Sequence, residues 1–380
     1  MNRKFWNLFR ATFFVFLFGF ATCLGAATAE PAAVPADRFP PADGPYVAVY
    51  RWGAANPHGG AKANEAFARW LHRPVVWAED FEPTERWDNI EGGGWQLGEW
   101  SAWKKAAPGR RLILSVPLLP GPWDRRGPAS GQAADQRVSL AAGAQGDYSK
   151  HYETLARQLV RYNLADSILR LGWEFNGGWY TWRGSDDPKA WAGYWRQVVK
   201  TMRAVPGAEK LKFCWNPALG WQQFQADKAW PGDDYVDFVG LDVYDESWAK
   251  DTYPWPAGTS AAEIESRRRK VWKDVSLDGS YGLRFWQRFA LKHDKPFAIP
   301  EWGLSHRGDK EDHGGLDDLY FLGQMHRFIA DPGNHVYFHC YFDVQAGDGH
   351  HQLSPGISGD EASDFPDAAA RFRELYSAHR

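Results

Sequence analysis

The chain is poor in cysteine, and this shortage excludes a class of protein. Of its 3 cysteines, only Cys214 and Cys340 lie beyond the N-terminal 29 residues. A small secreted domain would need disulfides, whereas a chain of 380 residues can bury a core large enough to fold without them. The sequence therefore indicates a large fold with two buried, free thiols.

Net charge is also small, at −3 for the whole chain. The first 29 residues carry Arg3, Lys4 and Arg10 and no acidic residue, so the remainder is near −6, which is −3 minus 3. A mildly acidic surface argues against nucleic acid or an anionic membrane as the main partner. We expect a monomer that binds neither.

One apolar run stands out, and it lies near the N-terminus. It extends from Ala11 to Leu24 behind the basic segment MNRKFWNLFR and ahead of the small-x-small site Ala27-Thr28-Ala29. The run is short for a membrane span, which predicts a signal peptide over 1–29. A linker rich in Pro and Ala follows over 30–45, and one domain over 46–380. We therefore expect a secreted or periplasmic protein with no membrane contact after cleavage.

A cleaved signal peptide has two alternatives. An uncleaved anchor would leave the chain at the membrane, but the run is shorter than a typical span. A lipid-modified Cys23 is disfavoured because the preceding residues, Phe20-Ala21-Thr22, lack the leucine of the usual lipoprotein signal.

Short β-rich runs alternate with helical stretches along the rest of the chain. The eight runs are VAVYRWG from Val47, PVVWAEDF from Pro74, RLILSVPLLP from Arg111, SILRLGWEF from Ser167, LKFCWNP from Leu211, VDFVGLDVYD from Val236, PFAIPEWGL from Pro296 and VYFHCYFDV from Val336. Eight strand–helix units with right-handed crossovers predict an α/β fold, a single (β/α)8 TIM barrel, with a doubly wound open sheet as the alternative. Cys214 and Cys340 fall in strands five and eight, which are not neighbours in a barrel.

Two glutamates end strands of this predicted barrel. Glu174 ends the fourth strand, inside LGWEFNGGWYTW, and Glu301 ends the seventh, inside FAIPEWGL. Because barrel active sites lie at the C-terminal ends of the strands, we expect the two carboxylates at one face. A single Glu there would more often form a salt bridge or a helix cap, but a pair matches the acid and the nucleophile of glycoside hydrolysis.

Aromatic residues make up 16% of the chain, with 22 Trp, and flat aromatic faces stack on sugar rings. Barrel-top packing is the alternative role for these Trp residues, and loop capping is the alternative for the Asn residues. The predicted substrate-binding residues are Trp52, Trp77, Asn176, Trp179, Asn216, Tyr244, Trp302, His306 and Tyr341.

The motifs around these residues resemble those of glycoside hydrolase family 26, the β-mannanase family. Its fourth strand has Arg four residues before the acid/base, then Asn-Gly, and Trp five residues after the acid/base; its sixth ends Gly-x-Asp-x-Tyr; its nucleophile lies in Glu-x-Gly. The matching residues are Arg170, Glu174, Asn176, Gly177, Trp179, Gly240, Asp242, Tyr244 and Glu301-Trp302-Gly303. The resemblance implies a retaining enzyme with Glu174 as acid/base and Glu301 as nucleophile.

The chain departs from the family pattern at two places. Trp173 stands where the family usually has His before the acid/base, and strand eight ends in Tyr341 and Phe342 where many members have an exposed Trp. The first change alters the subsite beside Glu174. The second weakens the implication that mannan is the substrate.

Supporting roles follow from strand geometry. Arg170 and Asp242 should point inward one layer below Glu174 and Tyr244, because side chains on one face of a strand repeat every second residue. A buried Arg needs an anionic partner, and Asp242 is available. The phenol of Tyr244 would hold Glu301, while burial and the charge of Glu301 would keep Glu174 protonated.

The segment HRGDKEDHGG contains His306, His313 and several acids. Its spacing fits no standard zinc pattern, so we expect no metal and no cofactor, with His306 contacting substrate instead. The expected function is endo-acting hydrolysis of a β-linked polysaccharide, such as β-mannan or a related exopolysaccharide. The alternatives are a carbohydrate-binding protein on a hydrolase fold and a transglycosylase.

Overall fold

The computed structural model describes residues 44–54, 56–121, 138–308, 312–356 and 363–377. These residues belong to one compact unit, Asp37–Arg380. The predicted signal peptide and nearly all of the predicted linker lie outside the described residues. Within the described ranges, no helix is both long enough and apolar enough to cross a membrane.

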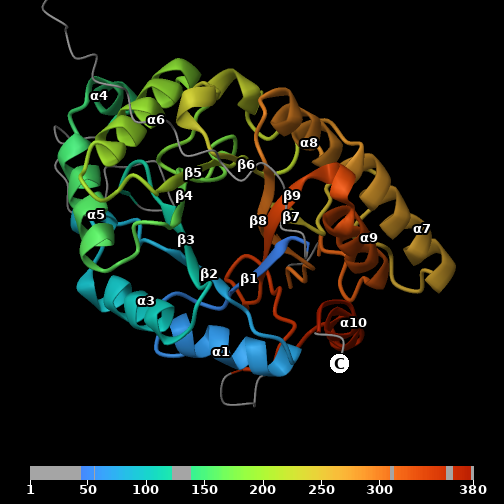
Figure 1. The fold of residues 1–380 in the computed structure, drawn as a ribbon. Coiled ribbons are helices and arrows are strands. Elements are labelled where there is room, and N and C mark those ends of the chain that lie inside the picture. The colour runs from blue at the N-terminus through green and yellow to red at the C-terminus, as the bar shows by residue number, and fades with distance from the viewer. Residues whose placement is uncertain (1–43, 55, 122–137, 309–311, 357–362, 378–380) are drawn as a thin grey trace, which may run out of the picture. The chain divides into compact units, whose positions relative to one another are not determined.

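Parallel strands close into a barrel at the centre of this unit (Figure 1). Strands pair in the order β6-β5-β4-β3-β2-β1-β9-β8-β7, and β6 also pairs with β8, which closes the ring. The sixth barrel strand is split into β6 and β7. The strands are β1 (Tyr46–Tyr50), β2 (Trp77–Phe81), β3 (Arg111–Val116), β4 (Ile168–Leu171), β5 (Lys212–Trp215), β6 (Phe238–Gly240), β7 (Val243–Tyr244), β8 (Phe297–Gly303) and β9 (Val336–Phe342). The predicted (β/α)8 barrel is confirmed, and each predicted run overlaps its strand, although β1 begins one residue before its run, at Tyr46.

Helices form a layer outside the strands (Figure 1). The α-helices are α1 (Gly60–Leu71), α2 (Trp87–Ile90), α3 (Gly94–Ala106), α4 (Leu140–Gln145), α5 (Ser149–Arg161), α6 (Pro188–Arg203), α7 (Ala261–Val271), α8 (Leu283–Lys292), α9 (Leu319–Ala330) and α10 (Pro366–Tyr376). Short 3-10 turns are η2 (Ala226–Ala229), η3 (Asp233–Tyr235) and η5 (Pro332–Asn334), and α7 continues into the π-helical segment η4 (Trp272–Leu277).

Local sequence explains where these helices begin and which face they bury. Asp187 caps α6 by accepting from the Ala190 backbone N–H at 2.9 Å, and proline occupies the first turn. Helix α5 buries Tyr152, Leu155 and Leu159, which are spaced at helical intervals along one face. The apolar stripes on such helices cover the outer surface of the barrel and hold its strands in place.

The N-terminal end of the barrel interior is filled with aromatic rings. Trp77, the first residue of β2, is 2% exposed, and its ring stacks on Tyr46 at 4.3 Å. It also contacts Tyr337 and Phe338, and the Arg111 guanidinium lies over it at 5.3 Å. The prediction that Trp77 lines the sugar-binding rim is therefore wrong, because the residue begins its strand and packs at the opposite end of the barrel.

Both described cysteines are free and buried, as predicted. Cys214 lies on β5 and Cys340 on β9, and each is 0% exposed. Burial raises the pKa of both thiols above the ordinary value. They are therefore packing residues in the barrel interior.

Candidate active site

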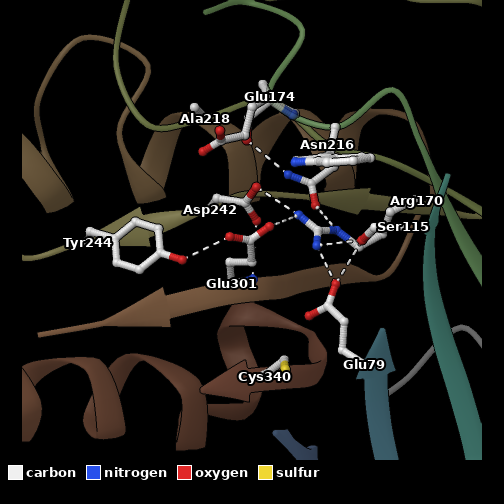
Figure 2. A network of polar contacts seen from close by, with 12 residues as sticks. Glu79, Ser115, Arg170, Glu174, Asn216, Ala218, Asp242, Tyr244, Glu301 and Cys340 are labelled. Carbon is white, nitrogen blue, oxygen red and sulfur yellow. Dashed lines mark hydrogen bonds and ion pairs between the residues drawn. The ribbon is translucent and has the colours of Figure 1, made fainter. Parts of the chain in front are cut away.

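Arg170 lies at the centre of a polar layer toward the C-terminal ends of the strands (Figure 2). Its guanidinium is 0% exposed and donates to Asp242 at 2.8 Å, the contact expected from the strand period. It also donates to Glu301 at 2.6 Å and to Asn216 at 2.9 Å. One buried cation on β4 thus orients Glu301 on β8, Asp242 in the sixth barrel strand and Asn216 just past β5.

Glu301 lies on β8 and is held by three residues from other strands. One carboxylate oxygen accepts from Arg170, and the other accepts from the Tyr244 hydroxyl at 2.8 Å. The Glu301 backbone N–H donates to Asp242 at 3.1 Å. Desolvation and the nearby acidic groups raise the pKa of Tyr244, which keeps its hydroxyl a donor. Both oxygens of Glu301 therefore accept hydrogen bonds, which fix the orientation of its carboxylate as a nucleophile requires.

Glu174 lies in a contrasting environment just past the end of β4. Its Oε2 accepts from the Trp179 indole N–H at 2.8 Å, and its backbone N–H donates to the Asn216 carbonyl at 2.8 Å. Burial, reinforced by the charge of Glu301, raises the pKa of Glu174 to about 8. The carboxyl is therefore protonated at neutral pH, as a general acid must be.

Backbone strain accompanies this placement. Glu174 has a φ of 50°, in the left-handed region that non-glycine residues seldom occupy. Close packing follows in the same turn, because a Cβ on Gly177 would lie 2.3 Å from the Trp179 ring. Glycine at this position leaves room for the indole that donates to Glu174. Strain of this kind persists where the surrounding structure enforces it, often at a functional site.

Glu79 is a third buried carboxylate, which the sequence analysis missed. It lies on β2, is 1% exposed, and accepts from Arg170 and from the Ser115 hydroxyl. Burial, opposed by Arg170 but aided by Glu301, raises the pKa of Glu79 to about 7. Period-two spacing from Trp77, which starts β2, was the signal available, but it required knowing where the strand begins.

Residues 150–255 match the family model described as glycosyl hydrolase family 26. The resemblance to glycoside hydrolase family 26 is confirmed. The matched segment includes β4 and β7, with Arg170, Glu174, Asp242 and Tyr244, whereas Glu301 lies beyond it.

Other known proteins resemble this chain over more of its length. A mannan endo-1,4-beta-mannosidase from Bifidobacterium adolescentis is 25% identical over 195 residues, which are 49% of this chain but only 18% of that protein. A Cellulomonas fimi endo-beta-1,4-mannanase structure has a TM-score of 0.56 at 16% identity, covering 88% of this chain and 71% of that one. The catalytic domain of a Bacillus sp. JAMB-750 endo-beta-1,4-mannanase has a TM-score of 0.57 at 15% identity, covering 87% and 86%. These structures share the fold.

Two asparagines that were predicted to contact substrate are buried beneath the site. Asn176 is 0% exposed and fastens the following loop, accepting from the Ala218 N–H and donating to its carbonyl, each at 2.8 Å. Asn216, also 0% exposed, accepts from Arg170. The prediction of direct sugar contact is wrong for both, because their amides are used in loop capping and in orienting Arg170.

Trp302 and Tyr341 face away from the barrel interior. Trp302 is 0% exposed, and its indole N–H donates to His339 at 3.0 Å. Tyr341, also 0% exposed, donates to the His351 carbonyl and packs on Phe372 of α10. Their predicted substrate contacts are wrong, because successive residues on a strand point to opposite faces and Glu301 points inward.

The remaining predicted contacts lie at the expected end of the barrel. Trp52 follows β1 and is 36% exposed, Trp179 follows Glu174 and is half-buried, and His306 follows β8 with its side chain 40% exposed. Two aromatic residues that were not predicted to contact substrate, Tyr50 and Phe342, lie beside Tyr244. Phe342 stacks on Tyr50 at 4.9 Å and lies edge-on to Tyr244 at 5.8 Å.

Proposed function

We propose that this protein is a secreted or periplasmic retaining glycoside hydrolase that cleaves within a β-linked polysaccharide. The observation that carries the proposal is the contrast between two neighbouring carboxyl groups. Glu301 is fixed by Arg170 and Tyr244, while the pKa of Glu174 is raised to about 8. One is prepared as a nucleophile and the other as an acid.

The first chemical step transfers the glycosyl group to the enzyme. An oxygen of Glu301 attacks the anomeric carbon while the carboxyl proton of Glu174 moves to the leaving oxygen, so that the glycosidic bond breaks as the ester forms. The Trp179 indole, 2.8 Å from Oε2 of Glu174, orients that carboxyl group. The Tyr244 hydroxyl, 2.8 Å from Oε2 of Glu301, orients the nucleophile.

The second step uses Glu174 as a base. Esterification removes the charge of Glu301, and that charge is one cause of the raised pKa of Glu174. Glycosylation of Glu301 therefore lowers the pKa of Glu174. The ionised Glu174 carboxylate then accepts a proton from the attacking water. Hydrolysis of the ester restores Glu301 with net retention at the anomeric carbon.

For the substrate we propose β-mannan or a related β-linked glycan, including an exopolysaccharide. The support is the printed activity of the relatives, of which the Bifidobacterium adolescentis protein is a mannan endo-1,4-beta-mannosidase. Trp52 and Trp179 are exposed or half-buried at the site and offer faces on which sugar rings can stack. We propose cleavage within the polysaccharide chain because the same relatives are described as endo-acting enzymes.

The test is incubation with a panel of β-mannan, β-glucan, β-xylan and bacterial exopolysaccharides. Falling viscosity together with new reducing ends is expected for at least one of them. Proton NMR of the first product should show the β-anomer before mutarotation. Binding without cleavage would contradict the proposal in favour of a carbohydrate-binding protein, and an initial α-anomer would contradict retention.

A further inference from the structure

Two histidines and one aspartate converge beside the candidate active site from three separate segments. His306 lies five residues past Glu301, His350 lies in the segment after β9, and Asp364 precedes α10. One nitrogen or oxygen atom from each lies within 4.8 Å of the others. The sequence analysis considered His306 with His313, but His313 instead lies 3.0 Å from the Ser247 carbonyl and takes no part in this cluster.

The two histidines are fixed by the backbone. His306 and His350 form an antiparallel bridge, with the N–H of each donating to the carbonyl of the other at 3.0 and 2.8 Å. Directly opposed residues in such a bridge project to the same side. Both Nδ1 atoms face one oxygen of Asp364, at 2.9 Å from His306 and 2.7 Å from His350.

A second carboxylate lies behind the first histidine. Asp312 Oδ2 is 3.3 Å from Nε2 of His306, so this ring has a carboxylate at each nitrogen. Asp312 is itself held by the N–H groups of Arg307 and Gly314. Metal-ligating histidines commonly have an outer carboxylate of this kind, which fixes the ring and strengthens the ligand.

We propose that His306, His350 and Asp364 form a binding site for a divalent transition ion such as Zn²⁺. Two imidazole nitrogens and one carboxylate oxygen suit zinc and similar borderline ions. All three side chains are between 30% and 44% exposed, which leaves further coordination positions for water. The ion would bind between atoms that already contact one another, the two Nδ1 atoms and one oxygen of Asp364.

Such an ion would link the segment after β8, the segment after β9 and the segment before α10. His351, next to the ligand His350, packs its ring on Tyr244 at 4.6 Å, and Tyr244 donates to Glu301. The ion would therefore stiffen the wall behind the proposed nucleophile without entering the chemistry. This inference is independent of the substrate and of the hydrolytic mechanism.

The test is calorimetric titration of the untagged, chelator-treated full domain with ZnCl₂ at pH 7. One site per chain is expected. His306→Ala, His350→Ala and Asp364→Asn should each weaken binding at least tenfold, and Asp312→Asn by ~10-fold. His58→Ala is the matched control, because His58 is exposed and does not belong to the cluster, and it should bind as the wild type does.

A second measurement does not depend on the variants folding. Co²⁺ bound to the wild-type protein should give visible absorption bands that Zn²⁺ abolishes, and Zn²⁺ should raise the thermal midpoint. No Zn²⁺ binding by the wild type, or unchanged binding by all three ligand variants, would overturn the proposal. Loss of substrate affinity in His306→Ala with zinc binding intact would assign that residue to substrate instead.

Discussion

The two ends of the barrel interior are built from the same strands but from opposite chemistry. At the N-terminal end, Trp77 stacks on Tyr46 in a packed aromatic layer. At the other end, Arg170 is surrounded by Glu79, Asp242 and Glu301, three carboxylates for one cation. Because hydrophobic packing stabilises and buried like charges destabilise, the first end carries stability and the second carries function. Substitutions at the two ends should therefore fail in different ways.

The largest effect is expected for Glu301→Ala at the polar end. No glycosyl-enzyme can form without the nucleophile, so kcat/KM should fall by at least ~10⁴-fold, equivalent to about 5.5 kcal/mol. The variant should stay folded, because Arg170 keeps Asp242 and Glu79 as partners. Steady-state kinetics with circular dichroism as the control checks both, and a variant with more than a tenth of wild-type activity would remove Glu301 from the mechanism.

Glu174→Ala should lose ~10²- to 10⁴-fold on a polysaccharide, the usual contribution of a general acid. An aryl glycoside with an activated phenol needs little protonation, so its first step should survive and the second should become slow. Azide, which needs no general base, should rescue turnover and give a retained glycosyl azide. If azide instead gives the retained product with Glu301→Ala and the inverted product with Glu174→Ala, the two roles are reversed.

A third prediction concerns the aromatic end. Trp77→Ala should lower the free energy of unfolding by ~3–5 kcal/mol, the usual cost of removing a large buried aromatic side chain. Catalysis per folded molecule should be unchanged. Trp248→Ala is the matched control, because that Trp is 62% exposed, and it should cost less than ~1 kcal/mol. Denaturant titration checks the stability, and a loss of kcat without loss of stability would mean that the two ends are coupled.

The smallest expected effect is a shift in pH dependence. The pKa of Glu174 is raised to about 8, so the protonated acid is lost, and kcat/KM falls, as pH rises through about 8. The Trp179 indole lowers that pKa by donating to the carboxylate. Trp179→Phe should therefore move the alkaline limb to higher pH, and a move to lower pH would mean that another group sets the limb.

Strand periodicity predicted one end of this comparison well and the other poorly. Eight apolar runs identified the barrel, and the residues at their C-terminal ends included Glu174 and Glu301. Trp77 was misplaced because its run begins before the strand does, so an aromatic residue at the start of β2 was taken for one near its end. Trp302 was misplaced because adjacency to Glu301 was weighed above the alternation of side chains along β8.

Contacts between segments far apart in the chain could not be predicted from the sequence, for a different reason. Glu79 meets Arg170 across 91 positions, and His350 meets His306 only through a bridge between two loops. Periodicity specifies which way a residue points within its own element, but not which residue of another loop it will meet. The same limit explains why Asn176 and Asn216 were taken for sugar contacts when each has a partner inside the protein.

The left-handed backbone of Glu174 sets a conflict between folding and catalysis at a single residue. Glycine would adopt a φ of 50° without strain, and asparagine with little, but neither has a carboxyl group that can act as a general acid. Selection for stability alone would therefore draw this position away from glutamate. If the proposed function is correct, glutamate is retained at this position only while glycan cleavage is selected, and a descendant that no longer needs the activity is expected to lose this residue first and to become more stable.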